Sequence, residues 1–269
     1  MPEDPLPLSL AVITLNEGKN LERCLKSAAG LISEIVVVDS GSTDRTAEIA
    51  ESFGARVYFN AWPGHVAQKN VALSYCTQPW VISLDADEAV SEDLQRSIRN
   101  LFESGEPECA GYWINRKTFY LGAWINHAWY PEWRLRLVRA DAAKWVGTDP
   151  HDRLEVPGTA GKLQGDILHY SYADLQDHLK RTIDYGRIGA RAEIKKGKGF
   201  RWYKLVLSPW GRFAKSIVFK QAWRDGWRGW IIAFSSFLTC FAKHAFIYEA
   251  CLNQQIREDQ GGITGERMQ

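Results

Sequence analysis

The sequence contains neither of the two glycine-rich loops that commonly hold nucleotide phosphates. No GxGxxG motif follows the first predicted strand, and no GxxxxGK[ST] motif occurs in the 269 residues. A dinucleotide-binding domain requires the first motif, and a P-loop NTPase requires the second. The sequence therefore argues against both classes.

Cysteine is sparse and shows no paired spacing. The five cysteines are odd in number, lie far apart and include no CxxC pair. This pattern favours reduced thiols in a cytosolic protein over a disulfide framework or a zinc site. The acidic, proline-rich opening MPEDPLP is unlike a signal peptide. We therefore expect a cytoplasmic protein.

Long hydrophobic runs and a strong net charge are absent as well. The longest apolar stretch, Trp230 to Ala242, has 13 residues, whereas a membrane-spanning helix needs about 20. We therefore expect no conventional transmembrane helix. The formal net charge of +1 gives no overall field that would favour a nucleic acid as partner.

The first hundred residues alternate between short β-branched runs and helical patterns. The runs predict strands buried on both faces at residues 8–15, 34–40, 55–59 and 80–87. Helical patterns follow at residues 20–29, 43–53, 65–75 and 92–102. We expect Asn16, Ser42 and Ser91 to act as N-caps. This order predicts an α/β fold with a parallel sheet that binds ligands at the carboxyl ends of its strands.

The pattern changes after Glu103. Aromatic-rich segments, GYWINRKTFY and EWRLRLVR, predict antiparallel or mixed strands that continue the sheet. A helix near Tyr172–Glu193 and a Lys/Gly-rich hinge at 195–199 follow. Arg134 and Arg136 alternate on one strand face, where they either bind an anionic ligand or lie in solvent.

Carboxylates stand at the ends of two early strands. Asp39 closes the second strand, and Asp85 and Asp87 close the fourth. Strand alternation predicts that Asp85 and Asp87 face the same way. Any one aspartate alone would be a turn or cap residue, but the set forms an acidic rim that requires a cation. Mg²⁺ or Mn²⁺ with a diphosphate suits such oxygen ligands.

Three blocks of this sequence resemble the opening motifs of the family 2 glycosyltransferases of GT-A fold. They are AVITLNEGKNLERCL, IVVVDSGSTDRT and VISLDADE. The resemblance covers about residues 8–170. The blocks WPGHVAQKNVAL and WVGTDPHDRLEV are similar to the subgroup that includes lipopolysaccharide inner-core β-glucosyltransferases.

The resemblance implies roles for individual residues of the rim. Those expected to bind the nucleotide-sugar are Thr14, Leu15 and Glu17 at the nucleobase, Asp39 at the uracil or ribose, Lys69 at the base or phosphates, and Asp85 with Ala86 near the ribose and metal. Asp87 is expected to ligate Mn²⁺ or Mg²⁺. The donor would be a UDP-sugar.

Two further residues come from the second half of the resemblance. Asp152 is the expected catalytic base of an inverting transfer, although relatives often carry Glu after His at this place, and Asp149 is its neighbouring rival. His169 is expected to complete the metal shell, with a hydrogen-bonding or core histidine as the alternative. The QxxRW motif of processive synthases is absent, which favours one sugar per acceptor.

The C-terminal part is basic and rich in tryptophan. Residues 198–244 carry nine Lys/Arg and one acid, Asp225, for a charge of +8, together with five of the twelve tryptophans. This composition suits an anionic membrane surface, and the alternative is a helical appendage packed on the core or on another subunit in a homo-oligomer.

These observations predict a domain plan. A GT-A domain occupies residues 1–195, with a nucleotide half at 8–103 and an acceptor half at 104–195. A basic helical, aromatic-rich appendage at the membrane interface follows at 196–256, and a disordered tail at 257–269. The expected function is sugar transfer to a bacterial envelope glycolipid by a peripheral protein of the inner membrane face. A metal-dependent nucleotidyltransferase and a non-catalytic membrane-associated nucleotide-binding protein are the alternatives.

Overall fold

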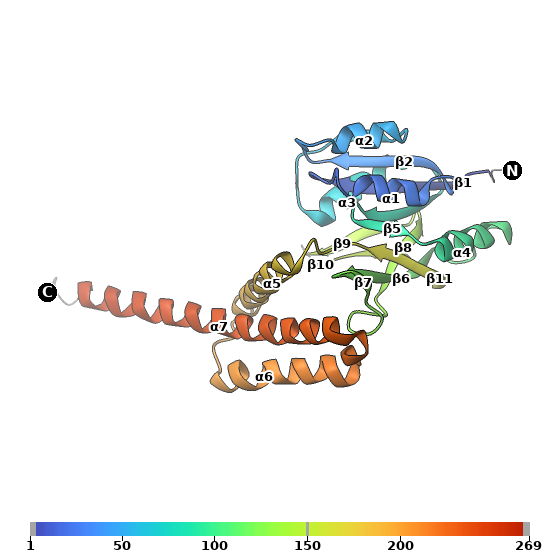
Figure 1. The fold of residues 1–269 in the computed structure, drawn as a ribbon. Coiled ribbons are helices and arrows are strands. Elements are labelled where there is room, and N and C mark those ends of the chain that lie inside the picture. Colours follow the sequence, from blue (N-terminus) through green and yellow to red (C-terminus); the bar gives the residue numbers. More distant parts are fainter. Residues whose placement is uncertain (1–3, 149–150, 266–269) are drawn as a thin grey trace. The chain divides into compact units, whose positions relative to one another are not determined.

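The structure is a computed structural model that describes residues 4–148 and 151–265 (Figure 1). The chain divides into two compact units. The first unit comprises Met1–Phe119 and Tyr130–Ser171, and the second comprises Tyr120–Trp129 and Tyr172–Gln269.

The first unit is built on a mixed sheet. Its strands are β1 (Leu6–Thr14), β2 (Ile32–Asp39), β3 (Arg56–Phe59), β4 (Trp80–Asp85), β5 (Glu88–Val90), β6 (Gly111–Tyr120), β8 (Trp133–Arg139) and β11 (Ala160–His169), in the spatial order β3-β2-β1-β4-β8-β6-β11-β5. The strands β1 to β4 pair in parallel, whereas β8 runs antiparallel to both β4 and β6. Both the parallel first half and the mixed second half confirm the sequence predictions.

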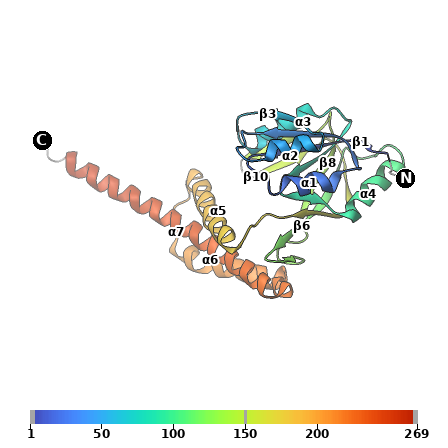
Figure 2. The same cartoon turned by 45° about the horizontal axis from the view of Figure 1, so that its top comes forward.

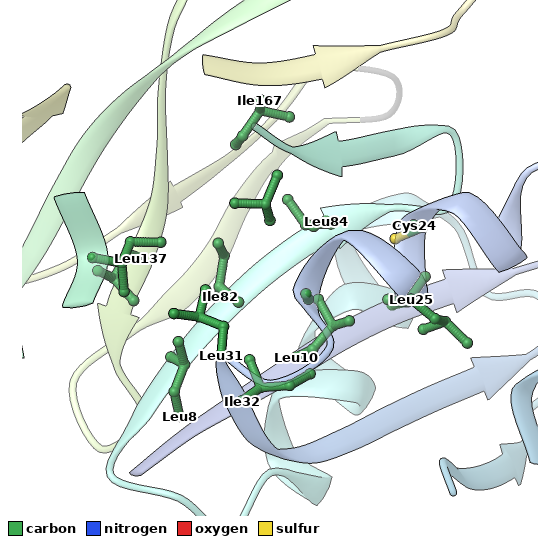
Figure 3. Close-up of a cluster of buried hydrophobic side chains, with 14 of the residues drawn as sticks. Leu8, Leu10, Cys24, Leu25, Leu31, Ile32, Ile82, Leu84, Leu137 and Ile167 are labelled. Atoms are coloured by element: carbon green, nitrogen blue, oxygen red, sulfur yellow. The ribbon is translucent and has the colours of Figure 1, made fainter. Parts of the chain in front are cut away.

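Helices cover both faces of this sheet, because apolar side chains along each central strand point alternately to one face and to the other. On β1, Leu8 and Leu10 pack in one core cluster with residues of α1 (Leu21–Ala28) and α4 (Glu92–Glu103) (Figure 3). Ala11 packs in a second cluster with residues of α3 (His65–Tyr75). Helix α2 (Thr46–Ser52) joins the first cluster through Ala50. The central strands are therefore buried on both sides, as their sequence predicts.

The predicted helix starts are only partly right. Ser91 caps α4, since its Oγ accepts a hydrogen bond from the N–H of Leu94. Asn16 and Ser42 are not N-caps, because α1 begins at Leu21 and α2 begins at Thr46. Both side chains are used in the loops instead, where Ser42 Oγ donates to Asp39. Helix α3 coincides with its predicted range.

A small antiparallel sheet lies beside α3. It consists of β9 (Lys144–Thr148) and β10 (His151–Glu155), with Asp152 opposite Gly147. Trp145 and Leu154 bury their side chains in the same core cluster as Ala72 of α3. This packing fixes the register of β10 and thereby the place of Asp152.

The second unit is helical. It contains β7 (Ala123–Trp124), α5 (Leu175–Lys195), α6 (Trp202–Ala214), the π-turn η1 (Lys215–Phe219), the 3₁₀-turn η2 (Ala222–Asp225) and α7 (Gly226–Gly265). Helix α6 lies beside the first part of α7 in both views (Figures 1 and 2). Helix α5 crosses α7 closely, because a Cβ on Gly186 would stand 2.8 Å from the Cβ of Ala242. This packing joins α5 to α7 in the second unit, whose longer segment begins at Tyr172.

Helix α7 is the longest helix that the structure describes. It spans Gly226–Gly265. The segment Ala222–Asn253 is also long and apolar enough to cross a membrane, by length and composition alone. The uninterrupted apolar run is shorter than this segment, because Lys243 and His244 interrupt the run but not the helix.

Candidate active site

The loops after β1 and β2 are joined at the carboxyl end of the sheet. Asn16 Oδ1 accepts a hydrogen bond from the N–H of Thr43 (2.9 Å), and the N–H of Gly18 donates to Asp44 Oδ2 (3.1 Å). Asn16 has a φ of 56°, a left-handed conformation that asparagine tolerates better than most residues. The two strand ends therefore form one rim, as a parallel sheet requires.

Asp39 organises the loop that follows β2. Its oxygens accept hydrogen bonds from Thr14 Oγ1 (2.8 Å), from Gly41 N (2.9 Å), and from the N and Oγ of Ser42 (2.7 and 2.5 Å). Burial alone would raise the pKa of Asp39, but these bonds, led by those from Ser42, lower it. A carboxylate offers about four acceptor positions. A nucleoside that bonds to Asp39 must therefore share or replace one of its donors.

The other residues expected at the nucleoside lie on the same rim. Thr14 ends β1 and is buried, whereas Leu15 exposes its side chain. Glu17 Oε2 accepts a hydrogen bond from Asn20 Nδ2 (3.0 Å), which fixes the start of α1. Ala86 is buried in the turn between β4 and β5. The structure thus brings these residues to one edge, and their roles toward a ligand stay predictions.

Lys69 connects two carboxylates that lie far apart in the sequence. Its Nζ stands 2.8 Å from Asp85 Oδ1 and 2.7 Å from Asp152 Oδ2, and it lies 4.4 Å from the centre of the Trp145 ring. The Lys69 residue is only 5% exposed. A buried ammonium that holds two carboxylates places the predicted base, Asp152, next to the acidic rim.

Asp85 has a second cationic partner. Its Oδ2 accepts a hydrogen bond from Arg136 Nη2 at 3.0 Å. Burial alone would raise the pKa of Asp85, but the charges of Lys69 and Arg136 hold it well below its usual range. Asp85 is thus ionised and paired on both oxygens by protein cations.

A chain of ion pairs extends from Arg136 through the mixed half of the sheet. Arg136 Nη2 also contacts Glu88 Oε1 (3.1 Å), which in turn contacts Arg116 Nη1 (3.2 Å). Arg116 then binds both oxygens of Glu132, at 2.9 and 3.0 Å. Arg136 and Glu88 are both buried, so the solvated face considered for Arg136 is wrong. Nε and Nη1 of Arg136 have no hydrogen-bond partner among the described residues.

Asp87 faces His169 rather than the partners of Asp85. Its Oδ2 stands 3.4 Å from His169 Nε2, and its carbonyl oxygen accepts a hydrogen bond from the N–H of Tyr170 (2.9 Å). Asp85 is the last residue of β4, and Asp87 lies in the turn before β5 begins at Glu88, so the two carboxylates have different partners. The turn aims Asp87 at the end of β11.

The Asp87–His169 pair fits a divalent cation that is completed by substrate. Nδ1 of His169 is buried without a hydrogen-bond partner in the part of the chain that the structure describes. Among these residues no group of three His, Cys, Asp or Glu side chains is arranged to hold a metal ion. Mn²⁺ and Mg²⁺ commonly bind through one or two protein ligands, with phosphates and water filling the shell. Asp87 Oδ2 and His169 Nε2 are suitable donors for such a site.

Four residues of this network were not predicted as site residues. Glu88, Arg116, Glu132 and Trp145 received no role, although the alternating charges of EWRLR hinted at paired residues on one strand face. The rival base, Asp149, lies outside the described residues, as does the side chain of His151.

The fold is Rossmann-like α/β, with carboxylates at the ends of its parallel strands. Residues 9–153 match the family model described as glycosyl transferase family 2. The chain belongs to this family, and its mixed, mainly parallel sheet is the GT-A fold. It is therefore a glycosyltransferase.

Curated relatives match nearly the whole chain. A lipopolysaccharide core biosynthesis glycosyltransferase of Rhizobium meliloti is 31% identical over 252 residues, which cover 91% of this chain and 93% of the relative. An uncharacterised glycosyltransferase of Rickettsia bellii is 43% identical over 246 residues, with 86% and 84% covered. The solved structure of S. aureus TarS residues 1–349 with UDP-GlcNAc is 15% identical, covers 88% of this chain and 82% of that one, and has a TM-score of 0.48. A TM-score of this size supports no conclusion about the present chain.

Proposed function

We propose that this protein transfers one sugar, with inversion, from a UDP-sugar to a hydroxyl of a lipopolysaccharide-core-type glycolipid. The observation that carries the proposal is the ion-paired group Asp85–Lys69–Asp152, with distances of 2.8 and 2.7 Å. It links a carboxylate of the acidic rim to a carboxylate that can accept a proton. A transferase needs both functions beside each other.

The donor nucleotide binds along the rim of β1, β2 and β4. Asp39 and Thr14 meet the uridine, since they are hydrogen-bonded to each other at the two adjacent strand ends. Leu15 and Glu17 border the base, and Asp85 with Ala86 borders the ribose. The family resemblance supports these roles, and the shared rim is consistent with them.

Asp87 and His169 hold Mn²⁺ or Mg²⁺ together with the donor diphosphate. Their oxygen and nitrogen atoms, 3.4 Å apart, suit ions that also accept phosphate ligands. When bound, the cation offsets negative charge on the departing diphosphate. Nδ1 of His169 is buried and has no hydrogen-bond partner among the described residues. The orientation of the His169 ring therefore depends on the cation and on the side chains packed around the ring.

Asp152 removes the proton from the acceptor hydroxyl. The acceptor oxygen forms its bond to the anomeric carbon as the bond from that carbon to the diphosphate oxygen breaks, and the proton passes to Asp152. A single displacement of this kind inverts the anomeric centre. Lys69 positions Asp152 through the contact of its Nζ with Asp152 Oδ2 at 2.7 Å.

The acceptor class follows from the relatives and from the chain itself. The Rhizobium meliloti relative acts in lipopolysaccharide core biosynthesis by its description, and the absence of QxxRW favours addition of a single sugar. A UDP-sugar donor also places the reaction on the cytoplasmic side of the inner membrane.

A nucleotide screen tests the proposal. Thermal shifts of the full chain are measured with UDP, GDP, ADP and UDP-sugars, each with Mn²⁺, with Mg²⁺ and with EDTA. UDP and one UDP-sugar should stabilise the protein much more strongly when a divalent cation is present. Stabilisation that is the same in EDTA, or a preference for another nucleotide, would contradict the donor and metal assignments. Release of pyrophosphate from a nucleoside triphosphate would indicate a nucleotidyltransferase instead.

A further inference from the structure

Helix α7 carries an exposed aromatic stripe on one side. Trp227, Trp230, Phe234, Phe241 and Tyr248 are all exposed. At 100° per residue their directions fall within roughly 60° of the helix circumference. The remainder of the helix is different, because residues such as Ile232, Ala233 and Ile247 are buried within the protein. The stripe therefore differs from the rest of the helix in being exposed, and part of it, at Trp230 and Phe234, contacts Phe213 of α6.

Helix α6 and the turn η1 extend this face. Phe213 of α6 lies 4.9 Å from Phe234 between ring centres, and Trp210 lies 4.9 Å from Phe237. Beyond these contacts Trp202 is 70% exposed and Phe219 of η1 is 81% exposed. We call Trp202, Trp210 and Phe219, together with the exposed stripe on α7, the aromatic face. Many large exposed apolar side chains on neighbouring helices mark an interaction site.

The charge of the same segment is strongly positive. Residues 198–244 contain nine Lys/Arg and one acid, Asp225. That acid is engaged inside the unit, where its carboxylate accepts hydrogen bonds from the N–H groups of Asn126, His127 and Ala128 at 2.9, 3.0 and 2.8 Å. The cations Lys215 and Lys220 are both exposed. Of the nine cations, Lys198 pairs with Glu193 of α5 at 2.8 Å, and a partner of the aromatic face meets the positive charge of the others.

We propose that the aromatic face binds an anionic phospholipid bilayer at its interface, with α6 and α7 lying along the surface. Tryptophan and phenylalanine insert among the headgroups and acyl chains, while lysine and arginine bind the lipid phosphates. A second copy of this chain does not fit, because two such surfaces would repel each other. A bilayer-spanning α7 is the other arrangement that its length and composition allow, but the burial of Ile232, Ala233 and Ile247 within the protein favours α7 lying along the surface.

Vesicle flotation of the full chain tests the proposal. The vesicles contain phosphatidylcholine alone, or phosphatidylcholine with phosphatidylglycerol, and no glycolipid or nucleotide. The protein should float with the anionic vesicles and stay behind with the neutral ones. Trp202→Ser combined with Phe219→Ser should weaken this binding by roughly tenfold or more. Trp113→Ser, an exposed tryptophan of β6 in the first unit, is the matched control and should bind as the wild type does.

Two double variants, each of which removes two exposed lysines, measure the electrostatic contribution to vesicle binding. Lys215→Gln with Lys220→Gln should weaken binding to anionic vesicles by roughly tenfold, since each cation near such a surface contributes on the order of a fewfold. Lys26→Gln with Lys144→Gln removes two exposed lysines of the first unit and should change little. Circular dichroism and UDP binding of each variant show that the chain remains folded.

Three results would overturn the proposal. One is equal flotation with neutral and anionic vesicles. The second is resistance of the membrane-bound protein to alkaline carbonate extraction, which would show a spanning α7. The third is a dimer in light scattering that the Trp202→Ser and Phe219→Ser changes dissociate, without vesicle binding. UDP binding that persists in any of these cases would show that the proposed donor binding is unaffected.

Discussion

At the scale of single residues, Lys69 holds the two carboxylates on which the reaction depends. It bridges Asp85 and Asp152 from a buried position on α3. Asp152→Asn keeps the size and a hydrogen-bond acceptor but cannot take a proton. We expect sugar transfer to fall by roughly 10²-fold to 10⁴-fold while Mn²⁺-dependent UDP binding changes little. Steady-state transfer and calorimetric UDP titration measure the two quantities.

Asp149→Asn is the control for this assignment. It changes the rival carboxylate three positions earlier in the same segment. If Asp152 is the base, Asp149→Asn should retain most of the activity. Wild-type turnover in Asp152→Asn with loss of turnover in Asp149→Asn would move the base to Asp149.

Asp87 gives a separate prediction for the metal site. Asp87→Ala removes one of the two donors that face each other across 3.4 Å. We expect UDP affinity in Mn²⁺ to fall by roughly tenfold or more, and the weak affinity in EDTA to stay the same. Isothermal titration with both conditions tests this, with Asp141→Ala as an exposed carboxylate control. Unchanged Mn²⁺-dependent affinity would remove Asp87 from the metal shell.

For Arg136 the prediction concerns the stability of the folded protein. It is buried between Asp85 and Glu88, so Arg136→Met leaves both carboxylates with one cation fewer in a region shielded from water. We expect a loss of about 3 kcal/mol in the free energy of unfolding. Urea denaturation measures it. Arg139→Met, which removes an exposed pair with Asp141, should have little effect, and equal losses in the two variants would argue against a structural role for Arg136.

At the scale of the element, the sequence predicts local patterns well and distant pairings poorly. Helix α3 and the four early strands follow from periodicity, because apolar spacing depends on neighbours in the chain. The contact of Lys69 with Asp152 spans 83 residues, and the register of β10 depends on how Trp145 and Leu154 pack. No local pattern encodes either one. The turn after Asp85 could not be predicted from local patterns either. It depends on the pairing of β5 with the distant strand β11.

Helix α5 carries a buried histidine that makes the second unit sensitive to pH. His178 Nδ1 and Tyr120 Oη lie 2.5 Å apart, and burial lowers the pKa of His178 to about 4 from 6.5. The unfolded chain therefore binds this proton more readily between pH 6.5 and 4. The contribution of neutral His178 is complete above pH 6.5 and is lost as the pH falls toward 4. We expect a slope of up to about 1.4 kcal/mol per pH unit in this range.

Urea unfolding at several pH values between 7 and 4 tests this slope. The difference between wild type and His178→Gln isolates the contribution of His178 from that of the carboxylates. The variant should lose less stability on acidification, and its curve should converge on the wild-type curve as the pH approaches 4. His65→Gln, in the first unit, should retain the wild-type dependence. Parallel curves for wild type and His178→Gln would show that His178 does not titrate differently in the two states.

At the scale of the whole molecule, the chain combines a donor site in one unit with a lipid-facing surface in the other. Donor chemistry needs only the first unit, whereas an acceptor embedded in a bilayer also requires that the protein reach the membrane. Charge variants of the second unit should therefore separate the two activities. Lys215 and Lys220 suit this purpose because they are exposed and lie outside the donor site.

We expect Lys215→Gln with Lys220→Gln to lower transfer to glycolipid in anionic vesicles by roughly tenfold, while slow hydrolysis of the UDP-sugar in solution stays at the wild-type rate. Raising the ionic strength should reproduce this loss in the wild type, because salt screens the attraction between lysine and lipid phosphate. Radiolabelled sugar counted separately in the lipid and water phases measures both reactions in one assay. The Lys26→Gln and Lys144→Gln pair should leave both rates unchanged. Equal losses of transfer and hydrolysis in the Lys215 and Lys220 variant would indicate damage to the donor site, and unchanged transfer would show that these lysines do not bring the enzyme to its acceptor.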